Sequence, residues 1–161
     1  MPKKLKILVI RFSSIGDIVL TTPIIRCLKK QLNSEVDYLT KSKYSDIITE
    51  NPHIRNVYLI DNIDNSYKQI LRSNKYDIIV DLQNNLRSWK IRAKMNTKSF
   101  VFNKKSFKRY LLIYFGIDLL KNHVVDRYFE TIAKLNVTND NKGLDFNVSS
   151  SIKLDFDSNQ T

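Results

Sequence analysis

The sequence predicts an α/β fold in which a parallel β-sheet of at least five strands carries helices on both faces. A short β-branched run at residues 7–10 is apolar throughout, as expected of a strand buried on both faces. A polar turn containing Gly16 follows, and apolar residues then recur at helical spacing from Ile18 to Leu32. Strand-like and helix-like segments alternate after that, which favours right-handed βαβ units and a parallel sheet.

The elements follow from this alternation. Five segments rich in β-branched and aromatic residues are predicted strands, at residues 5–11, 35–40, 57–60, 76–82 and 98–102. Segments with helical periodicity or helix-stop signals are predicted helices, at residues 18–32, 41–51, 64–74, 89–95, 110–115 and 123–135. Residues 144–148 are predicted to form a further short strand, and the polar tail 149–161 is predicted to fray.

The composition is that of a globular domain and gives no sign of a disulfide, a metal site or a membrane span. The 161 residues include 42% hydrophobic and 27% charged residues, which is ordinary for a globular domain with a real core. The single cysteine, Cys27, excludes an internal disulfide and is interpreted as a small buried apolar residue. One cysteine and two histidines do not form a zinc pattern, so no metal site is expected. With no apolar run of the roughly 18 residues that span a bilayer and no signal-peptide core, the protein is expected in the cytoplasm.

The net charge is the unusual feature. The chain holds 27 basic and 16 acidic residues, for a net charge of +11. Residues 87–127 alone contain eleven lysines and arginines but two aspartates. Such a charge attracts a phosphate-rich partner, which could be nucleic acid, an anionic membrane or a phosphorylated glycolipid. A merely solvated basic face is the alternative.

Asp17 is the candidate functional residue of the first loop. It follows the first strand at its carboxyl end, where open parallel sheets bind their ligands. One interpretation is a first-turn acid that caps the helix, and the other is a carboxylate that acts as a general base. Because Ser13 and Ser14 are equally good caps, capping alone does not require Asp17.

The segment from Arg11 to Pro23 resembles the N-terminal signature of glycosyltransferase family 9, the bacterial heptosyltransferases of the lipopolysaccharide core. The shared pattern is a basic residue at the strand end, two hydroxyl residues, Gly-Asp and a later Thr-Pro. The resemblance implies a Rossmann-like domain that forms one half of a GT-B transferase. It also implies an inverting, metal-independent enzyme without a cofactor, in which Asp17 deprotonates the acceptor hydroxyl. The implied donor is ADP-heptose or a related nucleotide sugar.

Two further segments resemble the family. Asp81 and Gln83 match an Asp-x-Gln segment at a strand end, and Asn84 stands where the family often has glycine. His123 and Arg127 match a later His-x-Val-x-Arg-Tyr element and would share a helix face. The resemblance thus implies one acceptor-binding set drawn from all three segments, namely Ser13, Ser14, Gly16, Gln83, Arg87, Ser88, His123 and Arg127. For the amides near residue 83, the alternative is that they satisfy their own turn.

The resemblance also sets expectations for the chain as a whole. Residues 1–148 would be the N-terminal, acceptor-side domain, and residues 149–161 a polar tail or the start of an interdomain linker. Because the nucleotide-sugar domain of the family is absent, the chain alone is expected to be inactive. Its partner would be a phosphorylated lipopolysaccharide core acceptor, at a position in the cytoplasm or peripheral to the inner face of the inner membrane.

Features of the sequence also suggest two other classes of protein. The strand ending at Asp81 also resembles the phosphorylated strand of receiver domains, but such a site needs further carboxylates where this chain has Arg11 and Phe12. Nucleic-acid binding would use the basic stretch, which spreads over several elements and carries no recognised reading motif. The sequence therefore favours a glycosyltransferase domain that does not bind nucleic acid.

Overall fold

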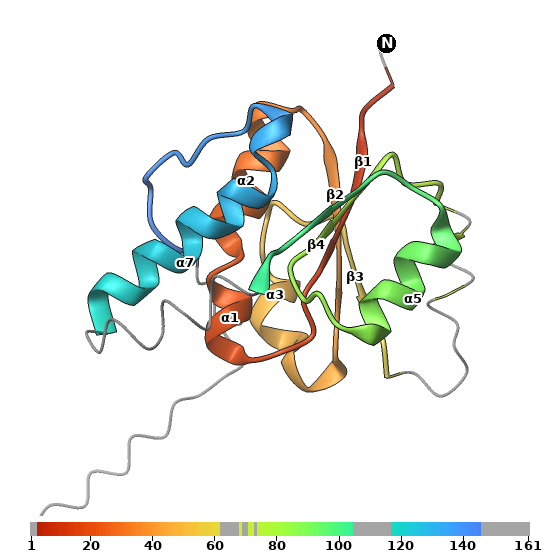
Figure 1. Cartoon of the computed structure of the whole chain (residues 1–161), viewed down its shortest axis with the longest axis horizontal. Coiled ribbons are helices and arrows are strands. Elements are labelled where there is room, and N and C mark those ends of the chain that lie inside the picture. Colours follow the sequence, from red (N-terminus) through yellow and green to blue (C-terminus); the bar gives the residue numbers. More distant parts are fainter. Residues whose placement is uncertain (1–2, 62–67, 69–70, 73, 105–116, 146–161) are drawn as a thin grey trace, which may run out of the picture.

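Five parallel strands form the centre of the domain. The computed structural model describes residues 3–61, 68, 71–72, 74–104 and 117–145, the side chains of 117–123 excepted. Its sheet has the strand order β3-β2-β1-β4-β5, and every pair of neighbours is parallel (Figure 1). The strands are β1 (Lys6–Ile10), β2 (Glu35–Thr40), β3 (Asn56–Leu59), β4 (Ile78–Asp81) and β5 (Ser99–Val101). The predicted fold class and all five predicted strands are confirmed.

The central strand is β1. Ile7 pairs with Val36 of β2 on one side and with Ile78 of β4 on the other. Ile7 and Val9 belong to the apolar core on one face of the sheet, while Leu8 and Ile10 belong to the core on the other. All four side chains are 0% exposed, which confirms the predicted strand buried on both faces.

Helices cover both faces, as predicted. The short helices α1 (Ile15–Val19) and α3 (Asp46–Thr49) and the longer α2 (Thr22–Gln31) and α7 (Ile117–Thr131) lie on the side of Ile7 (Figure 1). On the opposite side, α5 (Leu86–Met95) packs through Ile91 against the core that contains Leu8.

The first predicted helix is divided into two. We expected one helix to Leu32, but α1 ends at Val19 and α2 begins at Thr22. Proline offers no N–H and its ring clashes with the carbonyl four residues earlier, so a continuous helix through Pro23 is disfavoured. The hydroxyl groups of Thr21 and Thr22 instead donate to the carbonyls of Ile18 and Val19, at 2.6 and 2.8 Å.

Other element boundaries differ in detail. The predicted helix at 41–51 is a 3₁₀ turn at Ser42–Tyr44 followed by α3, and α7 begins six residues before the predicted 123. Residues 144–145 are not in a strand, and the rest of that predicted strand lies outside the described residues. The predicted helix at 110–115, most of that at 64–74 and the tail 149–161 also lie outside them.

Residues 137–145 form a strap that runs from α7 back to the start of α2 (Figure 1). Arg26 of α2, whose side chain is 3% exposed, holds it in place. Its Nε and Nη2 donate to both oxygens of Asp140 at 2.8 and 2.6 Å, and its Nη1 lies 2.6 Å from Asp145. The neighbouring Cys27 is buried, as predicted, and burial raises the pKa of its thiol.

A second buried ion pair lies at the opposite side of the sheet. Asp37 of β2 is 0% exposed and receives Nε and Nη2 of Arg55 at 2.9 and 2.6 Å. The hydroxyl of Tyr76 and the amide of Asn56 also donate to the Asp37 carboxylate. Arg55 contacts the more exposed Glu35 as well. This cluster joins β2 to the segments that enter β3 and β4.

Candidate functional site

Two loops meet at the carboxyl edge of the sheet. One joins β1 to α1, and the other joins β4 to α5. The backbone N–H of Phe12 donates to Oε1 of Gln83 at 2.9 Å, and Nη1 of Arg11 donates to the carbonyl of Leu82 at 2.6 Å. Two of the three segments of the implied acceptor-binding set therefore meet at one edge of the sheet.

Asp17 lies in the first turn of α1 and is fixed through one of its oxygens. Oδ2 accepts hydrogen bonds from the backbone N–H and the hydroxyl of Ser14, at 3.1 and 3.0 Å. Nη2 of Arg11 lies 2.6 Å from the same oxygen. Among the described residues no group donates to Oδ1, so this oxygen keeps its lone pairs for a ligand.

The surroundings of Asp17 keep it ionised. Partial burial alone would raise the pKa of Asp17, but the charge of Arg11 and the hydrogen bonds from Ser14 outweigh burial and lower that pKa below 3.8. A carboxyl whose pKa is lowered on folding stabilises the fold above its unfolded pKa. Asp17 therefore contributes stability from about pH 4 upward, and this contribution is lost as the pH falls through the lowered value.

Both interpretations of Asp17 agree with this geometry. Ser14 is the N-cap residue of α1, and Asp17 accepts from its backbone N–H, so Asp17 does cap the helix. Capping uses Oδ2, whereas proton abstraction would use Oδ1. The capping role therefore leaves the other oxygen for general-base chemistry.

Arg11 is a residue of the site that the predicted set omitted. It is 9% exposed, and its Nε donates to the carbonyl of Ser13 at 2.8 Å. Together with its bonds to Leu82 and Asp17, this engages the guanidinium in three directions. Arg11 therefore joins both loops and orients Asp17. The signal in the sequence that could have identified Arg11 was its position at the strand end in the family signature.

Three acceptor-binding candidates of the first loop lie beside Asp17. Ser14 and Gly16 are exposed, and Ser13 is half-buried. A Cβ added at Gly16 would meet nothing within 4 Å among the described residues, so packing does not require glycine there. The open space beside Gly16 leaves room for a ligand to approach the backbone.

The second loop is built around Asp81, whose side chain is 0% exposed. One of its oxygens accepts from the backbone N–H groups of Gln83 and Asn84, at 3.0 and 2.8 Å, and the other lies 2.8 Å from Nε of Arg92. Asn84 adopts a left-handed backbone with φ of 44°, which asparagine tolerates better than most residues. An aspartate so enclosed is not a phosphate acceptor, which argues against a receiver domain.

Ser88 is buried, whereas a residue that binds the acceptor would be expected to be accessible. It is 0% exposed, and its hydroxyl accepts from the N–H of Asn85 and donates to the carbonyl of that residue, both at 3.0 Å. These bonds form the N-terminal cap of α5, so Ser88 shapes the loop and does not face a ligand. Gln83 uses Oε1 to join the loops, which leaves its amide NH₂ as the donor for an acceptor hydroxyl.

The remaining candidates lie farther along the same edge. Arg87 is exposed and donates to the carbonyl of Ile60, just beyond β3, at 3.2 Å. Arg127 of α7 lines a cavity of about 240 Å³ with Asn103 and other residues at the end of β5. Its Nε is buried and has no hydrogen-bond partner within the described part of the chain. His123 lies one helical turn earlier in α7, as predicted, but its side chain is outside the described residues.

The charges of Arg11 and Asp17 also affect the pKa values of two further residues, Lys104 and Tyr128. Burial lowers the pKa of Lys104, and the charge of Arg11 lowers it further, while the charges of Asp81 and Asp17 oppose the shift. Burial raises the pKa of Tyr128 to about 12, and this residue packs edge-to-face on Phe102 with ring centroids 5.0 Å apart. The sequence carried no signal for either, because Lys104 belongs to a basic run and Tyr128 to an apolar helix face.

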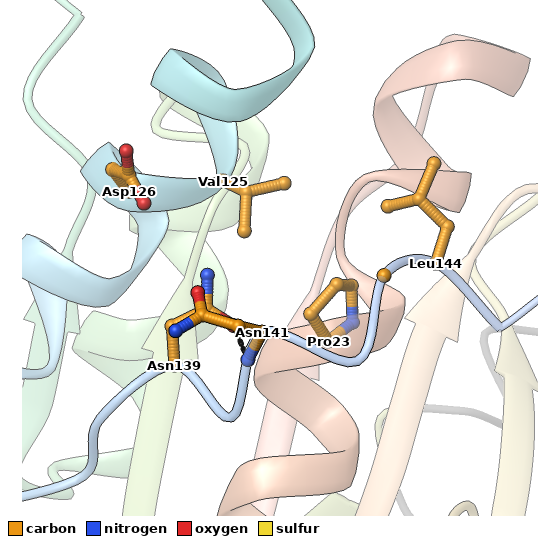
Figure 2. Close-up of a pocket in the computed structure, with 7 residues that line it drawn as sticks. Pro23, Val125, Asp126, Asn139, Asn141 and Leu144 are labelled. Atoms are coloured by element: carbon orange, nitrogen blue, oxygen red, sulfur yellow. Dashed lines mark hydrogen bonds between the residues drawn. The ribbon is translucent and has the colours of Figure 1, made fainter.

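A cavity of about 440 Å³ on the flank of the domain is separate from this site. Figure 2 shows it between α7, the strap and the start of α2, where Asn139 and Asn141 face Asp126 and Val125 of α7. None of its lining residues comes from the loops that carry Asp17 and Gln83.

Across the described residues no group of three or more His, Cys, Asp or Glu side chains is placed to hold a metal ion. In the same part of the chain, no helix has the length and apolar character needed to cross a bilayer.

Comparison with known proteins relates the chain to heptosyltransferases. No family model matches it. Lipopolysaccharide heptosyltransferase 1 of Campylobacter coli is 28% identical over 111 residues, which cover 65% of this chain and 32% of that protein. Lipopolysaccharide heptosyltransferase 3 of Escherichia coli is 40% identical over 78 residues, which cover 42% of this chain and 23% of that protein. The chain thus spans about a third or less of these relatives.

Solved structures show the same fold over more of the chain. A family 9 glycosyltransferase of Veillonella parvula superposes with a TM-score of 0.70 at 20% identity, covering 92% of this chain and 47% of the other. The E. coli heptosyltransferase WaaC, solved with ADP, gives a TM-score of 0.65 at 16% identity and 50% coverage of its chain. The resemblance is confirmed: the chain is similar in sequence to parts of two lipopolysaccharide heptosyltransferases and has the fold of about half of a family 9 glycosyltransferase.

Proposed function

We propose that this chain is the acceptor-side domain of an inverting, metal-independent heptosyltransferase that acts on a lipopolysaccharide core acceptor. The observation that carries the proposal is the Asp17 carboxylate, held through Oδ2 by Arg11 and Ser14 while no described residue donates to Oδ1. It lies at the carboxyl edge of the sheet, where open α/β sheets bind ligands. The similarity to named heptosyltransferases supports the identity of the sugar.

In this proposal Asp17 is the general base. The acceptor hydroxyl oxygen forms a bond to the anomeric carbon of an ADP-heptose-type donor, the bond from that carbon to the diphosphate breaks, and ADP leaves. The hydroxyl proton passes to Oδ1 of Asp17. A carboxylate with a lowered pKa is a weak base, but the attacking oxygen becomes strongly acidic as its new bond forms. The pair with Arg11 keeps Asp17 ionised and correctly oriented for this step.

The acceptor would be held by the groups that surround Asp17. The amide NH₂ of Gln83 and the hydroxyls of Ser13 and Ser14 suit sugar hydroxyl groups. Arg87 and Arg127 supply cations for acceptor phosphate or carboxylate groups through charge-assisted hydrogen bonds. The nucleotide sugar would be bound mainly by a second domain, so the base and the donor site would come from different halves of the enzyme.

Calorimetry on the 161-residue chain tests whether this domain binds the acceptor but not the nucleotide sugar. We expect a phosphorylated lipopolysaccharide core oligosaccharide to bind, and ADP-heptose to bind weakly or not at all. Arg127→Ala should weaken acceptor binding, whereas Lys30→Ala should not, because Lys30 is exposed in the last turn of α2, away from the site. Micromolar affinity of the chain for ADP-heptose, or loss of acceptor binding in both variants alike, would contradict the proposal.

A further inference from the structure

The first turn of α5 exposes large apolar side chains to solvent. Leu86 is 69% exposed and Trp89 is 53% exposed. With Ile15 at the start of α1, which is 55% exposed, they are the three most exposed large apolar side chains among the described residues. All three lie in the first turns of α1 and α5, which follow the loops that Phe12 and Gln83 join at the carboxyl edge of the sheet. Packing within the domain gives no reason for this clustering.

The two faces of α5 explain how these side chains come to be exposed. Ser88 and Ile91 are buried against the sheet. Leu86 and Trp89 are three residues apart, so they are neighbours on the helix surface. Both remain largely outside the core, which leaves an apolar pair at the tip of the helix.

Basic residues surround this apolar pair. Arg87, Lys90 and Lys94 of α5 are exposed, and the helix contains no acidic residue. An apolar groove between α5 and residues 71–72 extends the surface, with Lys90, Lys94 and Arg72 among the residues that line it. An exposed tryptophan and leucine among cations are typical of surfaces that lie in the interface of an anionic bilayer.

We propose that the surface formed by Leu86, Trp89, Arg87, Lys90 and Lys94, here called the α5 tip, binds the surface of an anionic phospholipid bilayer. Leu86 and Trp89 enter the headgroup region, and the three cations contact lipid phosphates. A protein partner would not require three cations without an acid, and a nucleic acid would not require an exposed leucine. Because the first turn of α5, with Leu86 and Trp89, lies at the same edge of the sheet as Asp17, binding brings the site toward lipid-anchored molecules. The inference goes beyond the proposed transfer reaction and does not depend on it.

The fluorescence of Trp89 provides a direct test, since it is the one tryptophan of the chain. The full chain is titrated with vesicles of 70% phosphatidylcholine and 30% phosphatidylglycerol, and in parallel with vesicles of phosphatidylcholine alone. We expect a blue shift of the emission and protection from acrylamide with the anionic vesicles, and neither with the neutral ones. An unchanged spectrum, or binding in which Trp89 stays as open to acrylamide as in the free chain, would overturn the proposal.

Matched variants distinguish vesicle binding through the α5 tip from nonspecific adsorption through any exposed apolar side chain. Leu86→Ser keeps the fluorescent probe and should weaken vesicle binding about tenfold, as expected for losing the burial of one leucine. Lys90→Gln with Lys94→Gln should weaken it by about tenfold or more, because each basic residue adds to attraction by an anionic surface. Leu144→Ser, which changes an exposed leucine of the strap, should leave binding unchanged. If Leu144→Ser weakens binding as much as Leu86→Ser, or if Trp89 is covered by self-association without lipid in sedimentation, the proposal is wrong.

Discussion

Replacing Asp17 by asparagine is expected to lower turnover about 10²–10⁴-fold in an enzyme that joins this domain to its nucleotide-sugar half. The amide has no lone pair basic enough to take the acceptor proton, although asparagine caps a helix about as well as aspartate. The measurement is turnover at saturating donor and acceptor. Activity within about threefold of the wild type would return Asp17 to a capping role, on the scale of general-base effects.

Two controls separate chemistry from structure in this experiment. Asp17→Asn leaves the buried guanidinium of Arg11 without its anion, so we also expect some loss of stability, of about 1–3 kcal/mol. Thermal melting of the same preparation shows whether the enzyme is folded at the assay temperature. Ser14→Ala removes a hydrogen bond to Oδ2 and a proposed acceptor contact but keeps the base, so its KM for the acceptor should rise while its turnover at saturating acceptor stays near that of the wild type.

The pH dependence of the enzyme should follow the pair between Arg11 and Asp17. Because the pKa of Asp17 is lowered, activity should not decline from protonation of this group until the pH falls below about 4. Arg11→Met removes the largest of the contributions that together outweigh burial, so the pKa of Asp17 should rise and the acidic limb of the profile should move to higher pH. An acidic limb that stays in place in this variant would contradict the positioning role of Arg11.

Replacing Arg55 by methionine is expected to lower the free energy of unfolding by about 3–5 kcal/mol, because it leaves a buried carboxylate without its cation. Asp37 is 0% exposed and receives both Nε and Nη2 of Arg55, and methionine keeps much of the volume but none of the charge. Urea unfolding monitored by circular dichroism measures the change.

Glu35→Gln is the matched control for Arg55→Met. It removes the other anion beside Arg55, but this carboxylate is 30% exposed, and exposed ion pairs contribute about 0–1 kcal/mol. A loss of stability in Glu35→Gln as large as that in Arg55→Met would mean that burial of Asp37 does not decide the effect.

The sheet could be predicted from the sequence because its buried strands consist mainly of apolar residues, which can be recognised directly. The run at Ile7–Ile10 is apolar on both sides, and the structure buries every one of these side chains. The division between α1 and α2 was missed because apolar spacing continues through the break. Pro23 was the local signal, but proline is also common in the first turn of a helix, so its presence alone does not decide between the two.

The candidate site could be predicted only in part. Asp17 and the joining of its loop to that of Gln83 followed from the family signature and from parallel topology. The burial of Ser88 could not be foreseen, because a serine that caps a helix and one that binds a sugar have the same sequence context. Arg11 stood in the family signature but was not assigned a role, whereas Lys104 and Tyr128 depend on how separate elements pack around Asp17, and no local pattern encodes that packing.

The most direct test of the central claim is to map the acceptor on the isotopically labelled chain by NMR. A phosphorylated lipopolysaccharide core oligosaccharide is titrated in, and backbone amide shifts are followed. The account predicts that the largest changes fall on residues 13–17 and 83–87, with smaller ones near Arg127, and that ADP-heptose produces none of comparable size. Changes confined to the cavity beside the strap, or larger changes with ADP-heptose than with the acceptor, would contradict it.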